Sequence, residues 1–83
     1  MSKKSRLLQR LCERPKDFTW DEACALMRQC GFQLHKRPGS SRMFVHVTTR
    51  QKVGLHEPHE SSLKPYAVEA LIAALQEAGE IAQ

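Results

Sequence analysis

Residues 31–59, GFQLHKRPGSSRMFVHVTTRQKVGLHEPH, carry the alternation of apolar and polar side chains from which we predict a small β-sheet. Side chains on a strand point alternately to opposite faces, so apolar residues at every second position indicate a strand with one buried face. Two such alternations occur, the first at Phe32 and Leu34 and the second at Met43, Val45 and Val47. The direction of Phe44 stays open, because it lies between the apolar residues of the second alternation.

Turn-forming residues divide this segment into three strands. Proline fixes φ and glycine tolerates positive φ, so Arg37-Pro38-Gly39-Ser40 predicts the first turn. Residues 49–52 form the second hairpin loop, and Gly54 in the last strand marks a bulge or a close backbone approach. The predicted strands are 32–36, 43–48 and 53–55.

Two helices are predicted before the sheet. Apolar residues at helical spacing indicate a short helix over 5–13, which Pro15 stops. Thr19 and Glu22 form a capping box that begins the second helix, and Gly31 supplies the left-handed residue that ends it. The apolar positions of the first helix are Leu7, Leu8, Leu11 and Cys12. Those of the second are Trp20, Ala23, Cys24, Met27 and Cys30.

A last helix follows the sheet. Ser61 or Ser62 can cap it, but proline pushes its predecessor out of the helical region, so the cap can instead be Lys64, with Pro65 in the first turn. Gly79 ends this helix. Its apolar stripe consists of Val68, Leu71, Ile72 and Leu75.

The fold class that follows is α+β, with the element order α-α-β-β-β-α and a small antiparallel three-stranded sheet covered on one face by helices. Eighty-three residues are enough for one modest core, so residues 1–83 are expected to form a single domain. We place its α-β-β-β-α core at about 19–79. Double-stranded RNA-binding domains share such a core, although a fold alone does not assign a function.

The charge distribution favours an anionic partner. Thirteen Lys and Arg face nine Asp and Glu, and no acidic residue lies between Glu22 and Glu57. This excess favours phosphate-bearing partners. The basic residues in that gap are Arg28, Lys36, Arg37, Arg42, Arg50 and Lys52.

The cellular location is predicted from the cysteine pattern and from the lack of a recognisable membrane span or signal peptide. Three cysteines without CxxC spacing indicate reduced, packed thiols rather than a disulfide framework. No apolar run approaches the ~20 residues of a membrane span, and no signal peptide is recognisable. We therefore expect a cytoplasmic protein that makes no contact with membrane.

Histidines supply the candidate chemistry. All four of them fall at His35, His46, His56 and His59. A zinc site is not expected, because structural zinc usually takes cysteines too, and the cysteines lie on helices distant in sequence. Acid/base catalysis on RNA needs no metal or other cofactor, because the 2′-hydroxyl is the nucleophile and histidine exchanges protons near neutral pH. Lys36 or Arg42 would then contact phosphate, and His35 is interpreted as a polar surface residue.

Several motifs resemble the HicA toxins of bacterial toxin-antitoxin systems. They are Gly31-Phe32, residues 37–44, Leu55-His56-Glu57-Pro58-His59 and Leu63-Lys64-Pro65. The resemblance implies a fold like the double-stranded RNA-binding domain, metal-independent cleavage of messenger RNA, growth arrest and neutralisation by a HicB-type antitoxin. The commonest family motif, glycine-serine-histidine, has Ser41 at the histidine position, whereas a longer form of the family carries glycine-serine-arginine.

The resemblance assigns the candidate site. His59 is the first choice for the catalytic group and His56 the second. The residues assigned to RNA contact are Lys36, Arg37, Ser40, Ser41, Arg42 and Lys64. The alternative functions are a noncatalytic RNA-binding module, followed by a structural protein that binds a partner. The nuclease hypothesis requires the imidazoles to converge with the basic groups on one solvent-facing surface.

Overall fold

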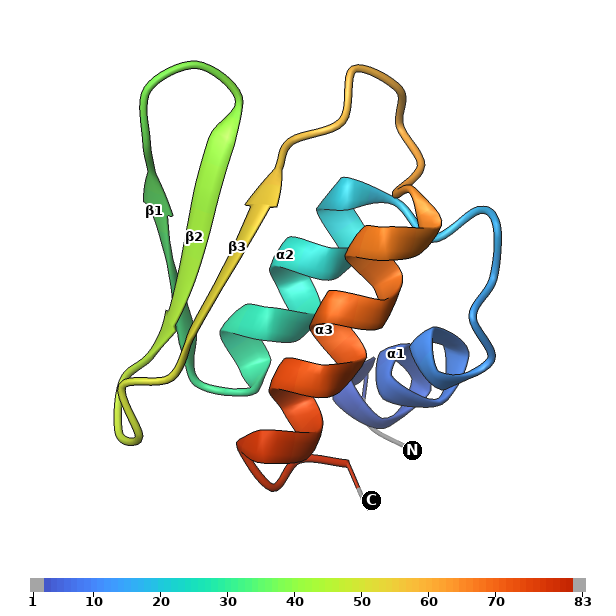
Figure 1. Ribbon diagram of the computed structural model, residues 1–83. Helices are drawn as coiled ribbons and strands as arrows, with labels where there is room; N and C mark the ends of the chain where they lie inside the picture. The colour runs from blue at the N-terminus through green and yellow to red at the C-terminus, as the bar shows by residue number, and fades with distance from the viewer. Residues whose placement is uncertain (1–2, 82–83) are drawn as a thin grey trace.

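The computed structural model describes residues 3–81 and confirms the α+β class and the predicted element order. Three helices and one antiparallel sheet make up the fold (Figure 1). The elements are α1 (Lys3–Cys12), α2 (Trp20–Gln29), β1 (Phe32–Lys36), β2 (Ser41–His46), β3 (Lys52–His56) and α3 (Pro65–Glu77).

The molecule has three layers. The strands lie in the order β1-β2-β3. Helices α2 and α3 cover one face of the sheet, with α2 against β1 and α3 against β3, while α1 packs on both helices on the side away from the sheet (Figure 1). Within residues 3–81, no helix combines the length and the apolar character needed to cross a membrane.

Local hydrogen bonds explain where the helices begin. The backbone N–H of Glu22 donates to Thr19 Oγ1 at 3.1 Å, and the backbone N–H of Thr19 donates to Glu22 Oε1 at 3.0 Å, which confirms the capping box. Helix α3 takes Lys64 as its N-cap, with Pro65 in the first turn, so the second of the two predicted caps is the observed one.

Glycine is suited to position 31, directly after the end of α2, for two reasons. Its φ is +90°, a conformation that side chains disfavour, and a Cβ at this position would come within 3.1 Å of His46 Nε2. The chain therefore turns directly from α2 into β1 and passes close beneath the His46 ring.

The structure decides which face of β2 points to the helices. The alternation of Met43, Val45 and Val47 favoured burial of these residues and left the direction of Phe44 open. In the structure Phe44 points to the helices with 1% of its surface exposed, while Val47 is 47% exposed. A shift of one residue exchanges the two faces of a strand. Phe44 takes the inward position because its ring is the largest apolar group on the strand and packs against Trp20. The two ring centroids are 5.7 Å apart.

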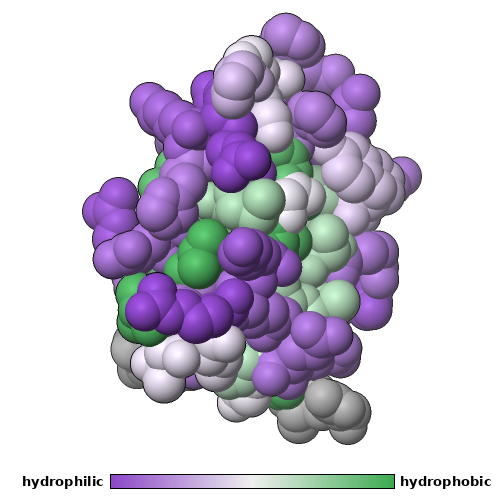
Figure 2. Space-filling view, turned by 60° about the vertical axis from the view of Figure 1, so that its left-hand side comes forward, coloured by the Kyte–Doolittle hydropathy of each residue, from purple (hydrophilic) through white to green (hydrophobic). Residues whose placement is uncertain are grey.

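The open face of the sheet is consequently more polar at its ends than at its centre. Met43 and Val45 are half-buried there, and Met43 covers Gly54, its partner in a regular register that has no bulge. Figure 2 brings the sheet side forward and shows apolar surface within hydrophilic surroundings. Leu34, predicted to be inward, is 38% exposed on the edge strand β1.

Residues from every helix and strand form one core cluster. Helix α2 adds Leu26, which the predicted stripe omitted, whereas Trp20 and Cys24 are only half-buried. The core residues are Leu7, Leu11, Phe18, Ala23, Leu26, Met27, Cys30, Phe32, Phe44, Leu55, Leu63, Ala67, Val68, Leu71, Ile72, Ala74 and Leu75.

All three cysteines are thiols in the structure. Cys30 is buried, as predicted, whereas Cys12 and Cys24 are half-buried. Burial raises the pKa of Cys30 to about 11, with a smaller contribution from Glu80. The Cys30 thiol is therefore protonated at neutral pH, which fits packing rather than nucleophilic chemistry.

Candidate active site

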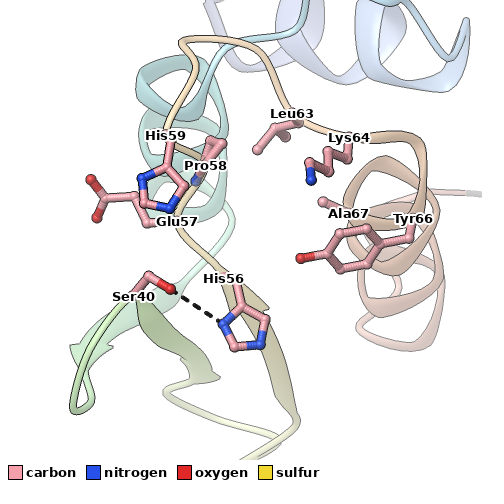
Figure 3. Close-up of a pocket in the computed structure, with 9 residues that line it drawn as sticks. All are labelled: Ser40, His56, Glu57, Pro58, His59, Leu63, Lys64, Tyr66 and Ala67. Atoms are coloured by element: carbon pink, nitrogen blue, oxygen red, sulfur yellow. Dashed lines mark hydrogen bonds between the residues drawn. The ribbon is translucent and has the colours of Figure 1, made fainter.

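A pocket lies between the end of β3 and the beginning of α3 (Figure 3). Its volume is about 270 Å³. The lining residues come from the β1–β2 turn, from β3 and the loop after it, and from the first turn of α3. They are Ser40, His56, Glu57, Pro58, His59, Leu63, Lys64, Tyr66 and Ala67.

Both histidines assigned to catalysis line this pocket. His56 is the last residue of β3, and His59 follows Pro58 in the loop; both are exposed. Ser40 Oγ lies 3.5 Å from His56 Nδ1, so the β1–β2 turn contacts one edge of the imidazole (Figure 3).

Lys64 and Tyr66 form the opposite wall. Proline at position 65 begins α3 and places these two residues on either side of the helix start. Figure 3 shows the Lys64 amine and the Tyr66 hydroxyl pointing across the pocket toward the side that carries His56 and His59. Two imidazoles, an amine and a phenol therefore line one small pocket.

Arg42 lies behind this pocket rather than in it. Its side chain is 14% exposed, and its Nε donates to Glu57 Oε1 at 3.0 Å. Its Nη1 donates to the carbonyl oxygens of Gly39 at 2.9 Å and Ser41 at 2.7 Å. The guanidinium predicted to contact phosphate is thus engaged in binding the β1–β2 turn to the segment that carries the two histidines.

The other residues assigned to RNA contact lie near the same end of the sheet. Lys36 ends β1 and Arg37 opens the following turn, and both are exposed. Ser41 begins β2 and is the register partner of His56. The pocket therefore gathers Ser40, His56, His59 and Lys64 from the predicted set, while Lys36, Arg37, Ser41 and Arg42 lie outside its lining.

The four histidines do not converge. His35 is on the open face of β1, opposite Met43. His46 is at the far end of β2, where its ring contacts Phe32 edge-on and its Nδ1 accepts the backbone N–H groups of Thr48 at 3.2 Å and Thr49 at 3.1 Å. Among residues 3–81, no three His, Cys, Asp or Glu side chains are grouped so that they could hold a metal ion.

Two polar residues of the pocket lining were not among the predicted site residues, Glu57 and Tyr66. Glu57 lies between the two histidines in the chain, and its role as the Arg42 acceptor depends on the pairing of β2 with β3. Tyr66 is the only tyrosine of the chain and stands two residues after Lys64 at a helix start. Its position in the sequence, two residues after the already assigned Lys64, was the feature from which Tyr66 could have been predicted as a site residue.

The fold and the pocket together define a small α+β domain with a histidine-containing site at one end of an open-faced sheet. Comparison with protein families identifies the kind of domain: the family described as the HicA toxin of bacterial toxin-antitoxin systems matches residues 20–79. The chain belongs to this family. It is therefore the toxin of a toxin-antitoxin pair and has a cognate antitoxin as its partner.

The family match confirms the resemblance inferred from the motifs between residues 31 and 65. It covers α2, the whole sheet and α3, and it leaves α1 outside. Comparisons with curated proteins and with solved structures gave no significant match.

Proposed function

We propose that this toxin is a metal-independent endoribonuclease that cleaves messenger RNA in the cytoplasm, arrests growth and is neutralised by an antitoxin of the HicB type. The proposal rests on one observation: His56 and His59 line the same pocket as Lys64, on a domain of the HicA toxin family. Cleavage of RNA by its own 2′-hydroxyl requires a proton acceptor, a proton donor and a positive charge, which an imidazole, an imidazolium and an amine can supply.

The reaction assigns one role to each group. One imidazole removes the proton from the 2′-hydroxyl while that oxygen bonds to the adjacent phosphorus. The bond from phosphorus to the 5′-oxygen breaks, and the second histidine, as imidazolium, protonates that oxygen. A 2′,3′-cyclic phosphate and a free 5′-hydroxyl result. We assign His59 as the first catalytic group and His56 as its partner.

Lys64 supplies the positive charge. Across the pocket from the histidines, its amine would stabilise the phosphoryl oxygens, whose negative charge grows in the transition state. Ser40 holds His56 and donates to a phosphate oxygen when RNA is bound. Lys36, Arg37 and Ser41, outside the pocket, would bind the flanking backbone, where contacts add affinity without sequence preference.

The pairing of β2 with β3 supports His56 despite the serine at the family's usual histidine position. Ser41 and His56 are direct register partners, so their side chains project from the same face of neighbouring strands. The backbone N–H of Glu57 donates to the carbonyl oxygen of Ser40 at 2.7 Å, so the neighbouring 41–56 pair is a non-hydrogen-bonded one, the closer of the two pair types. An imidazole is therefore available beside position 41, on the adjacent strand.

The test is cleavage of a generic messenger RNA by purified protein in the presence of a chelator. We predict that His59→Ala lowers the cleavage rate by at least about 100-fold, the usual contribution of a general acid or base, and leaves the thermal midpoint nearly unchanged because His59 is exposed. His35→Ala, an exposed histidine outside the pocket, is the matched control and keeps full activity. Equal activity in His59→Ala would remove this residue from the mechanism.

The same assay separates the proposal from a noncatalytic RNA-binding module. Intact RNA that migrates more slowly on a gel would favour that alternative. Expression in growing cells offers a second test, because the toxin alone should stop growth and co-expression of its antitoxin should restore it.

A further inference from the structure

Tyr66 is the one exposed aromatic residue in the part of the chain that the structure describes. Half of its surface, 51%, is accessible. The three phenylalanines are buried, and Trp20 is half-buried against Phe44. The other half of the Tyr66 surface packs against the protein, and the residues around the exposed ring indicate which ligand it could contact.

The surroundings of Tyr66 combine an apolar floor with polar walls. Leu63 and Ala67, both buried, lie beside it in the pocket lining, and Pro58 is half-buried on the other side. Figure 3 shows the Tyr66 ring on the α3 side of the pocket, with His56 and His59 on the strand side. A flat ligand lying against this ring would have its edge directed toward the imidazoles and the Lys64 amine.

We propose that Tyr66 is a stacking platform for one unpaired nucleobase, and that the substrate of this toxin is therefore single-stranded RNA. This inference rests on the proposed ribonuclease function and adds the substrate class and a specificity-determining residue to it. The base lies on the Tyr66 ring while the phosphate attached to its ribose lies among His56, His59 and Lys64.

Geometry and energetics favour a single strand over a duplex. Within a duplex each base is stacked between its neighbours and paired, so its face is not available to a protein ring. Bases of a single strand are free to stack on aromatic side chains. The pocket volume of about 270 Å³ also suits one planar base rather than a base pair. This domain thus resembles double-stranded RNA-binding domains in the order of its helices and strands, but the proposed stacking of a base on Tyr66 requires an unpaired strand.

Binding measurements with RNA that resists cleavage test the inference without relying on catalysis. The probes are a fluorescent twelve-nucleotide oligonucleotide with 2′-fluoro riboses, which lack the nucleophile, and the duplex formed with its complement. Fluorescence anisotropy gives the dissociation constant of the full chain for each. We expect Tyr66→Ala to weaken single-strand binding roughly 5- to 100-fold, the range for loss of one stacked base, and to leave duplex binding within about twofold.

Two further variants isolate the ring. Tyr66→Phe retains the aromatic face and is expected to bind the single strand within about twofold of the parent. Val47→Ala removes an apolar side chain of similar exposure, 47%, at the opposite end of the sheet and should change neither affinity. Thermal midpoints close to that of the parent would show that all three variants fold.

Three results would overturn the inference: unchanged single-strand affinity in Tyr66→Ala, an equal loss for single strand and duplex, or an equal loss in Tyr66→Phe. Failure of the nuclease proposal is recognised separately, by intact messenger RNA in the cleavage assay. A selective loss of single-strand binding in Tyr66→Ala supports the stacking role whether or not cleavage is observed.

Discussion

Arg42 controls the geometry of the pocket without lining it. Its guanidinium bonds to the Glu57 carboxylate and to the carbonyl oxygens of the β1–β2 turn. Glu57 lies between His56 and His59 along the chain, so this contact fixes the segment that presents both imidazoles. Arginine suits the position because its planar guanidinium donates several hydrogen bonds in fixed directions, which lysine cannot reproduce.

We predict that Arg42→Ala lowers the free energy of unfolding by about 1–3 kcal/mol, because the Glu57 carboxylate and two turn carbonyls lose a donor whose side chain is only 14% exposed. The cleavage rate should also fall, since both histidines lose their support. Urea unfolding monitored by circular dichroism and the RNA cleavage assay measure the two effects. Arg42→Lys should show an intermediate loss.

Arg37→Ala is the matched control for this prediction. Arg37 is an exposed cation five residues away, and its removal should change stability by less than about 0.5 kcal/mol. If Arg42→Ala retained full stability and lost only RNA affinity, Arg42 would be a phosphate contact, the role first predicted from the sequence.

At the scale of the element, the start of α2 depends on one carboxylate. Glu22 accepts from the backbone and hydroxyl of Thr19 and forms an ion pair with Arg10 of α1. Partial burial raises the pKa of Glu22, but the hydrogen bonds from Arg10 and Thr19 outweigh this effect and hold the pKa below its ordinary value. The same side chain thus caps α2 and attaches α1 to it.

This pKa shift has a definite sign for stability. A carboxyl whose pKa is lower in the folded state contributes stability above its unfolded pKa, and the contribution disappears as the pH falls through the folded value. We predict that Glu22→Gln, which preserves the capping box but removes the charge, lowers the unfolding free energy by about 0.5–1 kcal/mol at pH 7. The difference from the parent should vanish between about pH 5 and pH 3.

Urea unfolding across this pH range provides the measurement, and Glu13→Gln on an exposed carboxylate provides the control. A Glu22→Gln deficit that stayed constant down to pH 3 would show that the amide perturbs packing, and that charge is not the source of the effect.

At the scale of the whole molecule, the hydrophobic core extends beyond the residues that match the family. Helix α1 lies outside residues 20–79, yet Leu11 has no exposed surface and Leu7 has 8%. Ion pairs also join this end of the chain to residues of α2, α3 and the segment after α3. They are Lys4 to Glu80, Arg10 to Glu22 and Arg14 to Glu69. Helix α1 therefore completes the core beneath α2 and α3.

We predict that Leu11→Ala lowers the free energy of unfolding by about 2–5 kcal/mol, because it removes buried methyl groups and leaves a cavity. Thermal unfolding measures the change. Arg6→Ala, on an exposed position of the same helix, should stay within about 0.5 kcal/mol of the parent. A Leu11→Ala variant as stable as the parent would mean that the core of residues 20–79 does not need α1.

Local spacing was sufficient for features that depend on neighbours in the chain. The Thr19–Glu22 capping box, the bounds of β1 and the apolar stripe of α3 were all predicted, because each arises from contacts within a few residues. The family motifs likewise placed Ser40, His56, His59 and Lys64 among the candidates. These are short-range patterns that one stretch of sequence contains in full.

Tertiary packing decided the inward face of β2. The apolar residues at 43, 45 and 47 favoured one face, but Phe44 reaches Trp20 on α2. The polar residues that share its face, Arg42 and His46, find hydrogen-bond partners at the two ends of the strand. No pattern within β2 contains those partners, so its alternation alone pointed the wrong way.

The sequence by itself determined the helices and strands, their order and the family, and it placed Ser40, His56, His59 and Lys64 among the candidate site residues. Only the tertiary structure divided the four histidines between separate places, engaged Arg42 with Glu57 and brought Tyr66 opposite His56. The reason is physical: the pocket has one wall on β3 and another on α3, and the distance between two such walls is fixed by the packing of the whole core.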